Sequence, residues 1–152
     1  MLNGCPENGP AMTVDRSDSV HVVWPTLVAS PTPGSEPALA LFHAVSRDGR
    51  RFSARQRIPT EGFPRHVQVA LAPDGAVVAA WDEGEGGSRR IAIGQSVLDA
   101  RGRSVWQRRI ISGNTTATYP VIAASADGIV AAWTRETGPA SIIHVERLRS
   151  TP

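Results

Sequence analysis

The segment AVVAAW (76–81) is apolar at every position and ends on a tryptophan. Alternate residues of an extended strand point to opposite faces, so Trp81 and Ala79 lie on one face while Ala80 lies on the other. Because both faces of this strand are apolar, the sheet that contains it must be covered on both sides. A sheet from a simple two-layer sandwich would instead have one polar face.

The same pattern occurs three times along the chain. The tryptophans that end the three apolar segments are spaced by 57 and 52 residues. A polar turn precedes each segment, and a further apolar run opened by a proline precedes each turn. The segments are VHVVW (20–24), AVVAAW (76–81) and IVAAW (129–133), the turns are 15–19, 73–75 and 126–128, and the prolines are Pro10, Pro64 and Pro120.

Each repeat predicts up to four antiparallel strands joined by short turns. Four-stranded sheets of about 50 residues that cover one another on both faces form the blades of a β-propeller. We therefore predict an all-β protein of three antiparallel four-stranded blades, at about 5–59, 60–112 and 113–152. The expected strands are 10–14, 20–24, 39–46 and 52–58; then 65–71, 76–82, 89–96 and 104–111; then 119–125, 129–135 and 142–148, where the last blade lacks its fourth strand.

Composition excludes several classes of function. The net charge is only +2, and all 16 basic residues are arginines. Two arginine clusters fall in or beside the fourth strands of the blades, where charged side chains protect an exposed edge, so we expect no nucleic-acid partner. No apolar stretch approaches the roughly 20 residues of a membrane span. The start of the chain has no signal-peptide pattern, and the compartment stays open.

Cofactor and metal sites are not expected either. The four histidines lack the spacing of metal ligands. The glycine-rich segment GEGG (84–87) is not followed by a helix, so it does not predict a phosphate site. The single cysteine, Cys5, cannot form an internal disulfide, and it is interpreted as a structural thiol or as one half of a bridge to a partner outside this sequence.

The segment SRDGRRF (46–52) resembles the Asp-box turn of sialidase-like (BNR-repeat) β-propellers, although it is one residue short. Its matching residues are Ser46, Asp48, Gly49 and Phe52. The segment 96–106 keeps a looser version, and residues 3–12 resemble the opening of a blade in the bacterial exo-α-sialidase-like group. The resemblance implies a six-bladed propeller, of which this chain would hold half, and a family whose members are often secreted or periplasmic. The Asp-box itself implies a structural turn without chemistry.

Sialidases of this family bind the substrate carboxylate with three arginines and use a Tyr–Glu pair and an aspartic acid in catalysis. No complete set of this kind can be assigned here, so the resemblance leaves open whether the chain is an enzyme. In an antiparallel blade, the start of the first strand and the end of the second lie at the same end. We expect a polar rim there that suits a glycan or anionic sugar, or that is polar only because it is solvated. Its candidate residues are Asn8, Arg65, His66, Asp82, Glu83, Tyr119, Arg135 and Glu136, together with the loop 26–38.

Three interpretations of function remain open. The leading one is a fragment of a sialidase-like propeller without catalytic activity of its own. The second is a carbohydrate- or protein-binding module, and the third is a sialidase-type glycoside hydrolase assembled from two chains. A homodimer that closes a six-bladed ring would cover the outer blade faces, which include Val20, Val22, Val130 and Ala132.

Overall fold

The computed structural model describes residues 8–29, 36–85 and 87–149. Cys5 and the central part of the predicted rim loop, residues 30–35, lie outside the described residues. The elements are β-strands that form three antiparallel sheets, and no described segment is a helix with the length and apolar character of a membrane span. The first sheet contains β1 (Ala11–Val14), β2 (Val20–Val28), β3 (Ala38–Ser46) and β4 (Gln56–Ile58); the second contains β5 (Arg65–Leu71), β6 (Val77–Glu85), β7 (Ser88–Leu98) and β8 (Ser104–Ile110); the third contains β9 (Ala117–Ser125), β10 (Gly128–Thr137) and β11 (Ala140–Arg149).

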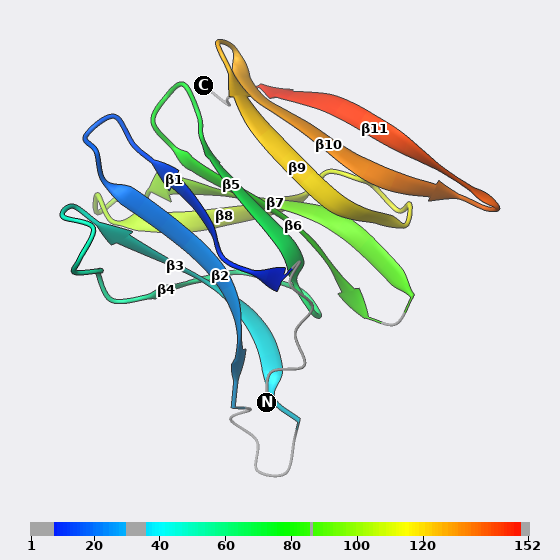
Figure 1. Ribbon diagram of the computed structural model, residues 1–152, viewed down its shortest axis with the longest axis horizontal. Coiled ribbons are helices and arrows are strands. Elements are labelled where there is room, and N and C mark those ends of the chain that lie inside the picture. The colour runs from blue at the N-terminus through cyan, green and yellow to red at the C-terminus, as the bar shows by residue number, and fades with distance from the viewer. Residues whose placement is uncertain (1–7, 30–35, 86, 150–152) are drawn as a thin grey trace.

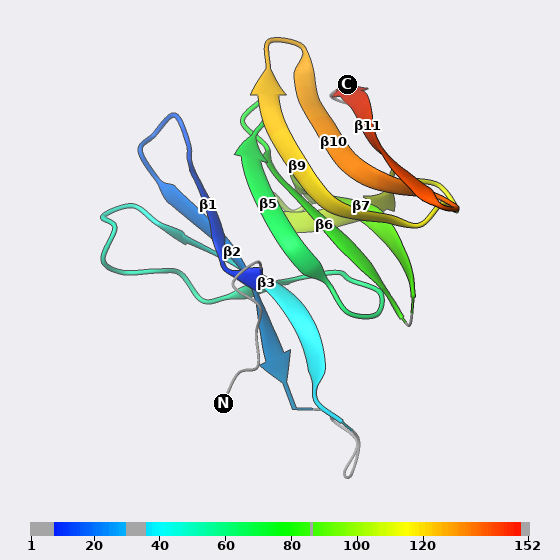
Figure 2. The same cartoon turned by 45° about the vertical axis from the view of Figure 1, so that its right-hand side comes forward.

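The sheets follow one another in chain order, with the second between the first and the third (Figure 1). Their first strands, β1, β5 and β9, lie next to one another in the same order (Figure 2). Within each sheet the strands pair with their neighbours in the chain, and the third sheet has only three strands in the described residues. The predictions of an all-β protein, of three blade-like antiparallel sheets and of an incomplete last sheet are therefore confirmed.

The central sheet is buried on both faces by its neighbours. Val77, Ala79 and Trp81 of β6 pack with residues of the first sheet, such as Leu41. The alternate residues, Val78 and Ala80, pack with the third sheet, including Trp133. Alternation along one apolar strand thus supplies two separate interfaces. Trp81 and Trp133 are thus buried between sheets, whereas Trp24 is only partly buried.

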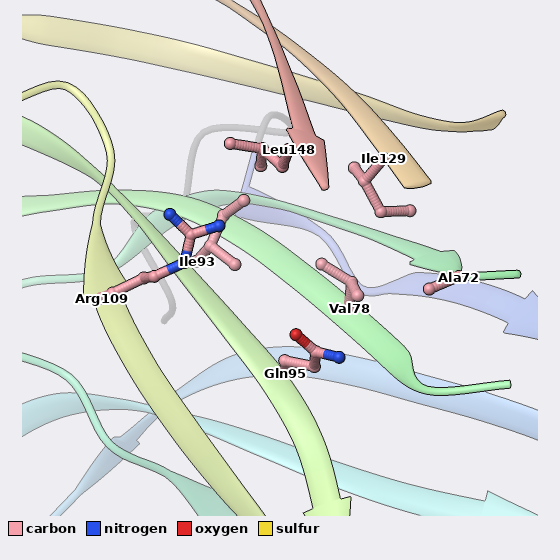
Figure 3. A pocket seen from close by; sticks show the side chains of 7 residues that line it. All are labelled: Ala72, Val78, Ile93, Gln95, Arg109, Ile129 and Leu148. Atoms are coloured by element: carbon pink, nitrogen blue, oxygen red, sulfur yellow. The ribbon is translucent and has the colours of Figure 1, made fainter. Parts of the chain in front are cut away.

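The interface between the second and third sheets is closely packed. Figure 3 shows its small cavity of about 20 Å³, which is lined mainly by apolar side chains, among them Val78, Ile93 and Leu148. A space of this size holds roughly one water molecule. The two sheets therefore form a continuous core without a ligand-sized gap at this point.

The outer face of the third sheet is uncovered. Val121 and Val145 pair with Ala132 from either side, and they are 54% and 61% exposed. On the opposite face of the same strand, Ala131 and Trp133 are almost fully buried. One apolar face of this sheet thus remains open to solvent; whether a second copy covers it remains a prediction.

Several details differ from the sequence prediction. The tryptophans do not end their strands, because β2, β6 and β10 each continue for four residues beyond them. The predicted strand 52–58 forms only at Gln56–Ile58, since residues before it belong to a wide turn in which the Ser53 amide donates to the Val45 carbonyl. The prolines are not all equivalent: Gln68 and Val121 occupy matching places opposite Ala80 and Ala132, so Pro120 matches Val67 and not Pro64.

Aspartate side chains organise the turns between strands. Asp48 Oδ1 accepts hydrogen bonds from the backbone amides of Arg51 (2.8 Å) and Arg50 (2.9 Å) and from the Ser46 hydroxyl (3.1 Å). These bonds, the Arg51 amide first, hold the pKa of Asp48 below its usual range. Gly49 has a φ of 67°, and Phe52 is 49% exposed. The aspartate of the predicted Asp-box therefore builds the turn that follows Ser46, the last residue of β3.

His43 lies in the interface between the first two sheets. Its ring packs edge-on against Trp106, with centroids 5.3 Å apart, and its Nε2 lies 3.0 Å from Nδ1 of His21. The other nitrogen of His21 lies 3.1 Å from a carboxylate oxygen of Asp15. Burial, and secondarily the charge of His21, lower the pKa of His43 to about 4.

Stability is therefore expected to depend on the neutral form of His43. In the unfolded chain this histidine has a pKa of about 6.5. The stability that depends on neutral His43 is therefore fully present above about pH 6.5 and is lost as the pH falls from about 6.5 to about 4. We expect the free energy of unfolding to fall by roughly 1–3 kcal/mol over this window from His43 alone. Urea unfolding at several pH values should show a smaller pH dependence for His43→Gln than for the wild type. His144→Gln, on the outer strand β11, is the control; equal pH dependence in all three proteins would contradict the prediction.

Candidate functional site

Two acidic residues follow Trp81 on β6, and both are buried. Asp82 and Glu83 are each 0% exposed. As consecutive residues of a strand they point to opposite faces, Asp82 toward the third sheet and Glu83 toward the first. A buried carboxylate is stable only when its oxygens are paired and hydrogen-bonded. The surroundings of these two residues therefore define two polar clusters.

The Asp82 cluster joins the starts of β5, β7 and β9. Arg89 Nε donates to Oδ1 of Asp82 over 2.6 Å. Since an ionised carboxylate only accepts, His66 Nδ1 donates to Oδ2 over 2.5 Å, and the backbone amide of Tyr119 donates to the same oxygen over 3.1 Å. The Asn8 side chain accepts a bond of 3.2 Å from the His66 amide. Asp82 thus fixes one residue of β5 and one of β9 in place.

His66 and Tyr119 have the same unusual backbone conformation. Their φ angles are 51° and 55°, in the left-handed region that bulky residues rarely adopt. Both lie beside irregularities in strand pairing, two residues before the matching positions of Gln68 and Val121. Their rings lie 4.3 Å apart between centroids, and Tyr119 is 53% exposed. The result is an aromatic pair on the surface whose backbone is held by a buried carboxylate.

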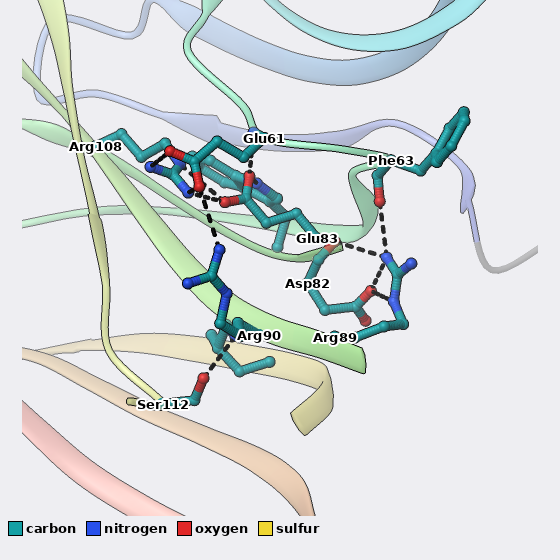
Figure 4. Close-up of polar contacts among 10 residues, drawn as sticks. Glu61, Phe63, Asp82, Glu83, Arg89, Arg90, Arg108 and Ser112 are labelled. Atoms are coloured by element: carbon teal, nitrogen blue, oxygen red, sulfur yellow. Dashed lines mark hydrogen bonds and ion pairs between the residues drawn. The ribbon is translucent and has the colours of Figure 1, made fainter. Parts of the chain in front are cut away.

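The Glu83 cluster lies on the other side of β6 (Figure 4). Oε2 of Glu83 accepts hydrogen bonds from the indole Nε1 of Trp81 (2.7 Å) and from the backbone amide of Glu61 (3.0 Å). Oε1 accepts from Arg108 Nε over 2.9 Å. Arg108 also pairs with the exposed carboxylate of Glu61, at 2.9 Å, and Arg90 pairs with Glu61 at 3.2 Å. Both oxygens of Glu83 are therefore occupied by this chain.

Arginines of the fourth strands are predicted to protect an exposed sheet edge, but Arg108 of β8 has another role, in the Glu83 cluster. Burial alone would lower the pKa of the Arg108 guanidinium, but the hydrogen bonds and charge of Glu83, with those of Glu61, raise it. Arg108 has only 15% of its side chain exposed. It therefore neutralises a buried acid and does not guard the sheet edge, whereas its neighbour Arg109 is exposed.

The structure places the predicted rim residues in three settings. His66, Asp82 and Tyr119, with Asn8, come together in the Asp82 cluster. Glu83 is separate from them, in the interior on the opposite face of β6. Arg65 and Glu136 are exposed on β5 and β10, and Arg135 is partly buried. Their assignment to a ligand site remains a prediction.

Four residues of the two clusters were not predicted from the sequence: Glu61, Arg89, Arg90 and Arg108. A usable signal was present. The acidic pair Asp82 and Glu83 stands across a short hairpin turn from the basic pair at 89–90, and the register brings Glu83 opposite Arg90. Opposite charges across antiparallel strands are a recognised pairing.

The Asp82 cluster is suited to binding more than to acid–base chemistry. Both carboxylate oxygens of Asp82 already accept hydrogen bonds from this chain, so Asp82 positions other residues. What reaches the surface is the Tyr119 ring, which is 53% exposed. Within the described part of the chain, no three His, Cys, Asp or Glu side chains gather in a way that would hold a metal ion.

No protein-family model and no curated protein sequence matches this chain. Several solved structures share its fold, among them the following two. A glycosyl hydrolase from Bacteroides ovatus matches with a TM-score of 0.51 and 15% identity, over 84% of this chain and 45% of that one. A structure from work on the GH130 family of mannoside phosphorylases, which contains glycoside hydrolases that target β-1,2-mannosidic linkages in Candida mannan, matches with a TM-score of 0.52 and 16% identity, over 95% of this chain and 52% of that one. The chain thus spans about half the length of the structures it matches.

The burial of Glu83 predicts a large difference between two acids that share Arg108. Glu83→Ala leaves the guanidinium and the Trp81 indole without their buried acceptor, and it should cost about 3–5 kcal/mol of unfolding free energy. Glu61→Ala is the matched control: its side chain is 62% exposed, so its loss should cost about 0–1 kcal/mol. Urea unfolding measures both. Similar losses in the two variants would show that the buried network is not a main source of stability.

Proposed function

We propose that this chain is a carbohydrate-binding part of a sialidase-like β-propeller and has no hydrolytic activity of its own. The observation that carries the proposal is the exposed Tyr119 ring, packed against His66 and held by the buried Asp82. Left-handed backbone at bulky residues persists only where the surroundings enforce it, and it clusters at binding sites. Here two such residues, from two sheets, meet at one place.

A sugar suits the exposed part of this cluster. The C–H face of a sugar ring packs against an aromatic ring, and its edge hydroxyls require polar partners. Arg65, which precedes His66 in the chain, is exposed, and it forms no ion pair among the described residues. An arginine beside an aromatic platform favours a sugar that carries a carboxylate, so the proposed ligand is an anionic glycan.

Hydrolysis by this chain alone is not supported. Glycoside hydrolysis in most families needs two carboxyl groups that flank one glycosidic bond. Asp82 and Glu83 lie on opposite faces of one strand, and each is bonded to an arginine. A complete site of sialidase type would need residues from elsewhere in a longer or assembled propeller. The sialidase-like relationship is part of this proposal, and a fragment of a longer propeller is its leading form; a hydrolase assembled from two chains is the alternative.

Binding is expected to depend on the Tyr119 ring. Tyr119→Asn removes the ring, while asparagine tolerates the left-handed backbone, and it should weaken the binding of sialic-acid oligosaccharides by at least about tenfold. Tyr119→Phe keeps the ring and should retain most of the affinity. Phe52→Ala is the matched control, because Phe52 is similarly exposed, at 49%, in the Asp48 turn. Calorimetry with sialyl and β-1,2-mannosyl oligosaccharides tests this; unchanged affinity in Tyr119→Asn, or no binding of either sugar, would refute the proposed site.

The isolated chain should not hydrolyse sialosides. Neither buried acid can reach a substrate, and no Tyr–Glu pair or arginine triad has been assigned. A fluorogenic sialic-acid substrate measures turnover directly. Turnover above the uncatalysed rate that disappears in Arg65→Ala or Tyr119→Asn would disprove the prediction and identify the rim as an active site.

A further inference from the structure

The second and third sheets place different residues after their buried tryptophan. In the second sheet, Trp81 is followed two positions later by Glu83, which accepts the indole N–H over 2.7 Å. Arg108, from the fourth strand β8, donates to the same carboxylate over 2.9 Å. One carboxylate thus satisfies two buried donors, an indole and a guanidinium. In the second sheet, the acceptor for both donors is therefore a glutamate two residues after the buried tryptophan.

In the third sheet the matching residues are Trp133 and Arg135. Trp133 is 3% exposed, and its Nε1 is buried without a hydrogen-bond partner. Arg135 stands where the second sheet has Glu83, and its Nε is likewise buried and unpaired. The acceptor of the second sheet is replaced by a second donor. In the described residues no fourth strand follows β11 to supply the missing acid.

Trp133 and Arg135 both line one pocket, which lies between the third sheet and the segment that follows β8. Its volume is about 210 Å³, and its walls include Trp133, Arg135, His144 and Glu146, with the segment that follows β8 around Ser112. His144 packs against Trp133, with ring centroids 4.5 Å apart. A buried donor without an acceptor destabilises the protein, and an acceptor that reaches it from the pocket would remove that cost.

Glu146 does not satisfy these donors. Its carboxylate lies 3.8 Å from His144 Nε2, with 44% of the side chain exposed, and it accepts no hydrogen bond from Trp133 or Arg135. It does set the charge of the pocket, because one acid and one arginine nearly cancel. A nearly neutral pocket does not compensate a second negative charge, so a dianion such as phosphate would pay a larger desolvation cost than a singly charged ligand. The donors and the charge together favour one carboxylate.

We propose that this pocket, the Trp133 pocket, binds a carboxylate that accepts hydrogen bonds from Trp133 Nε1 and Arg135 Nε. The carboxylate belongs either to a free small anion or to an acidic side chain on an extended segment that pairs with the edge of β11, as β8 pairs with β7 in the second sheet. The site is independent of the proposed glycan site, because no residue of the Asp82 cluster lines it. In this proposal Arg135, one of the predicted rim residues, binds its partner in the Trp133 pocket and not at the rim.

The indole N–H of Trp133 is a direct reporter of occupancy. In ¹H–¹⁵N spectra of the whole chain, assigned with Trp133→Phe, titration with acetate and with glucuronate should move this one indole signal downfield and saturably. Chloride at equal ionic strength should not move it. Arg135→Leu should weaken binding at least about tenfold, and Arg135→Lys, which keeps the charge but loses Nε–H, should bind less well than the wild type. Arg147→Gln, an exposed arginine of β11, should bind as the wild type does.

A strand-forming peptide of about seven residues with one central glutamate, compared with its glutamine counterpart, distinguishes the two sources. A shift with acetate supports a free anion, and a shift with the glutamate peptide alone supports an added strand. No saturable shift with any carboxylate, an equal response to chloride or to the glutamine peptide, or full affinity in a folded Arg135→Leu variant would overturn the proposal. Because Tyr119 variants leave the Trp133 pocket intact, failure of glycan binding does not affect this result.

Discussion

The fold depends on β6, a strand that is apolar on both faces and must therefore be covered twice. Val77, Ala79 and Trp81 pack toward the first sheet, and Val78 and Ala80 pack toward the third. At roughly 25 cal/mol per Å² of apolar surface removed from water, neither face is stable when left open. This requirement forces the three sheets into a stack and brings the starts of β5 and β9 together. The Asp82 cluster forms at that junction.

Covering both faces also explains why polar residues next to Trp81 are so fully paired. Where β6 leaves the apolar core, its next two residues are acids that the neighbouring sheets already enclose. Each acid then needs its own cation, Arg89 on one side and Arg108 on the other. Asp82 bonds to both His66 and Tyr119, and these two residues have the strained left-handed backbone conformation. In the third sheet, Arg135 and Trp133 repeat the geometry without an acceptor, and that difference defines the Trp133 pocket.

Much of the strand pattern could be predicted from the sequence, because two-sided apolar alternation and turn aspartates are local signals. β5 begins and ends where expected, and the absence of a fourth strand after β11 agrees with the described residues. The short β4 was not foreseen, because the amides that the Asp48 side chain binds extend the turn. Proline spacing misled the alignment at Pro64, since a pairing irregularity shifts β5 against β6. Apart from Trp81, the partners of Glu83 come from positions 22 and 25 residues away in sequence, and no local pattern reveals such distances.

The pair Asp82 and Glu83 looks in sequence like the two carboxylates of a glycoside hydrolase, but strand geometry separates them. Consecutive strand residues point to opposite faces, so these two acids face different sheets and cannot flank one glycosidic bond. For the pair to act together, the strand would have to break, and both arginine partners would have to leave. Separating Glu83 from Arg108 would leave a buried charge unpaired, at a cost of about 3–5 kcal/mol, and this cost opposes that rearrangement. Residues that satisfy inter-sheet packing are thus unavailable for acid–base work, and the proposed glycan site consists of side chains that this packing leaves exposed, above all Tyr119.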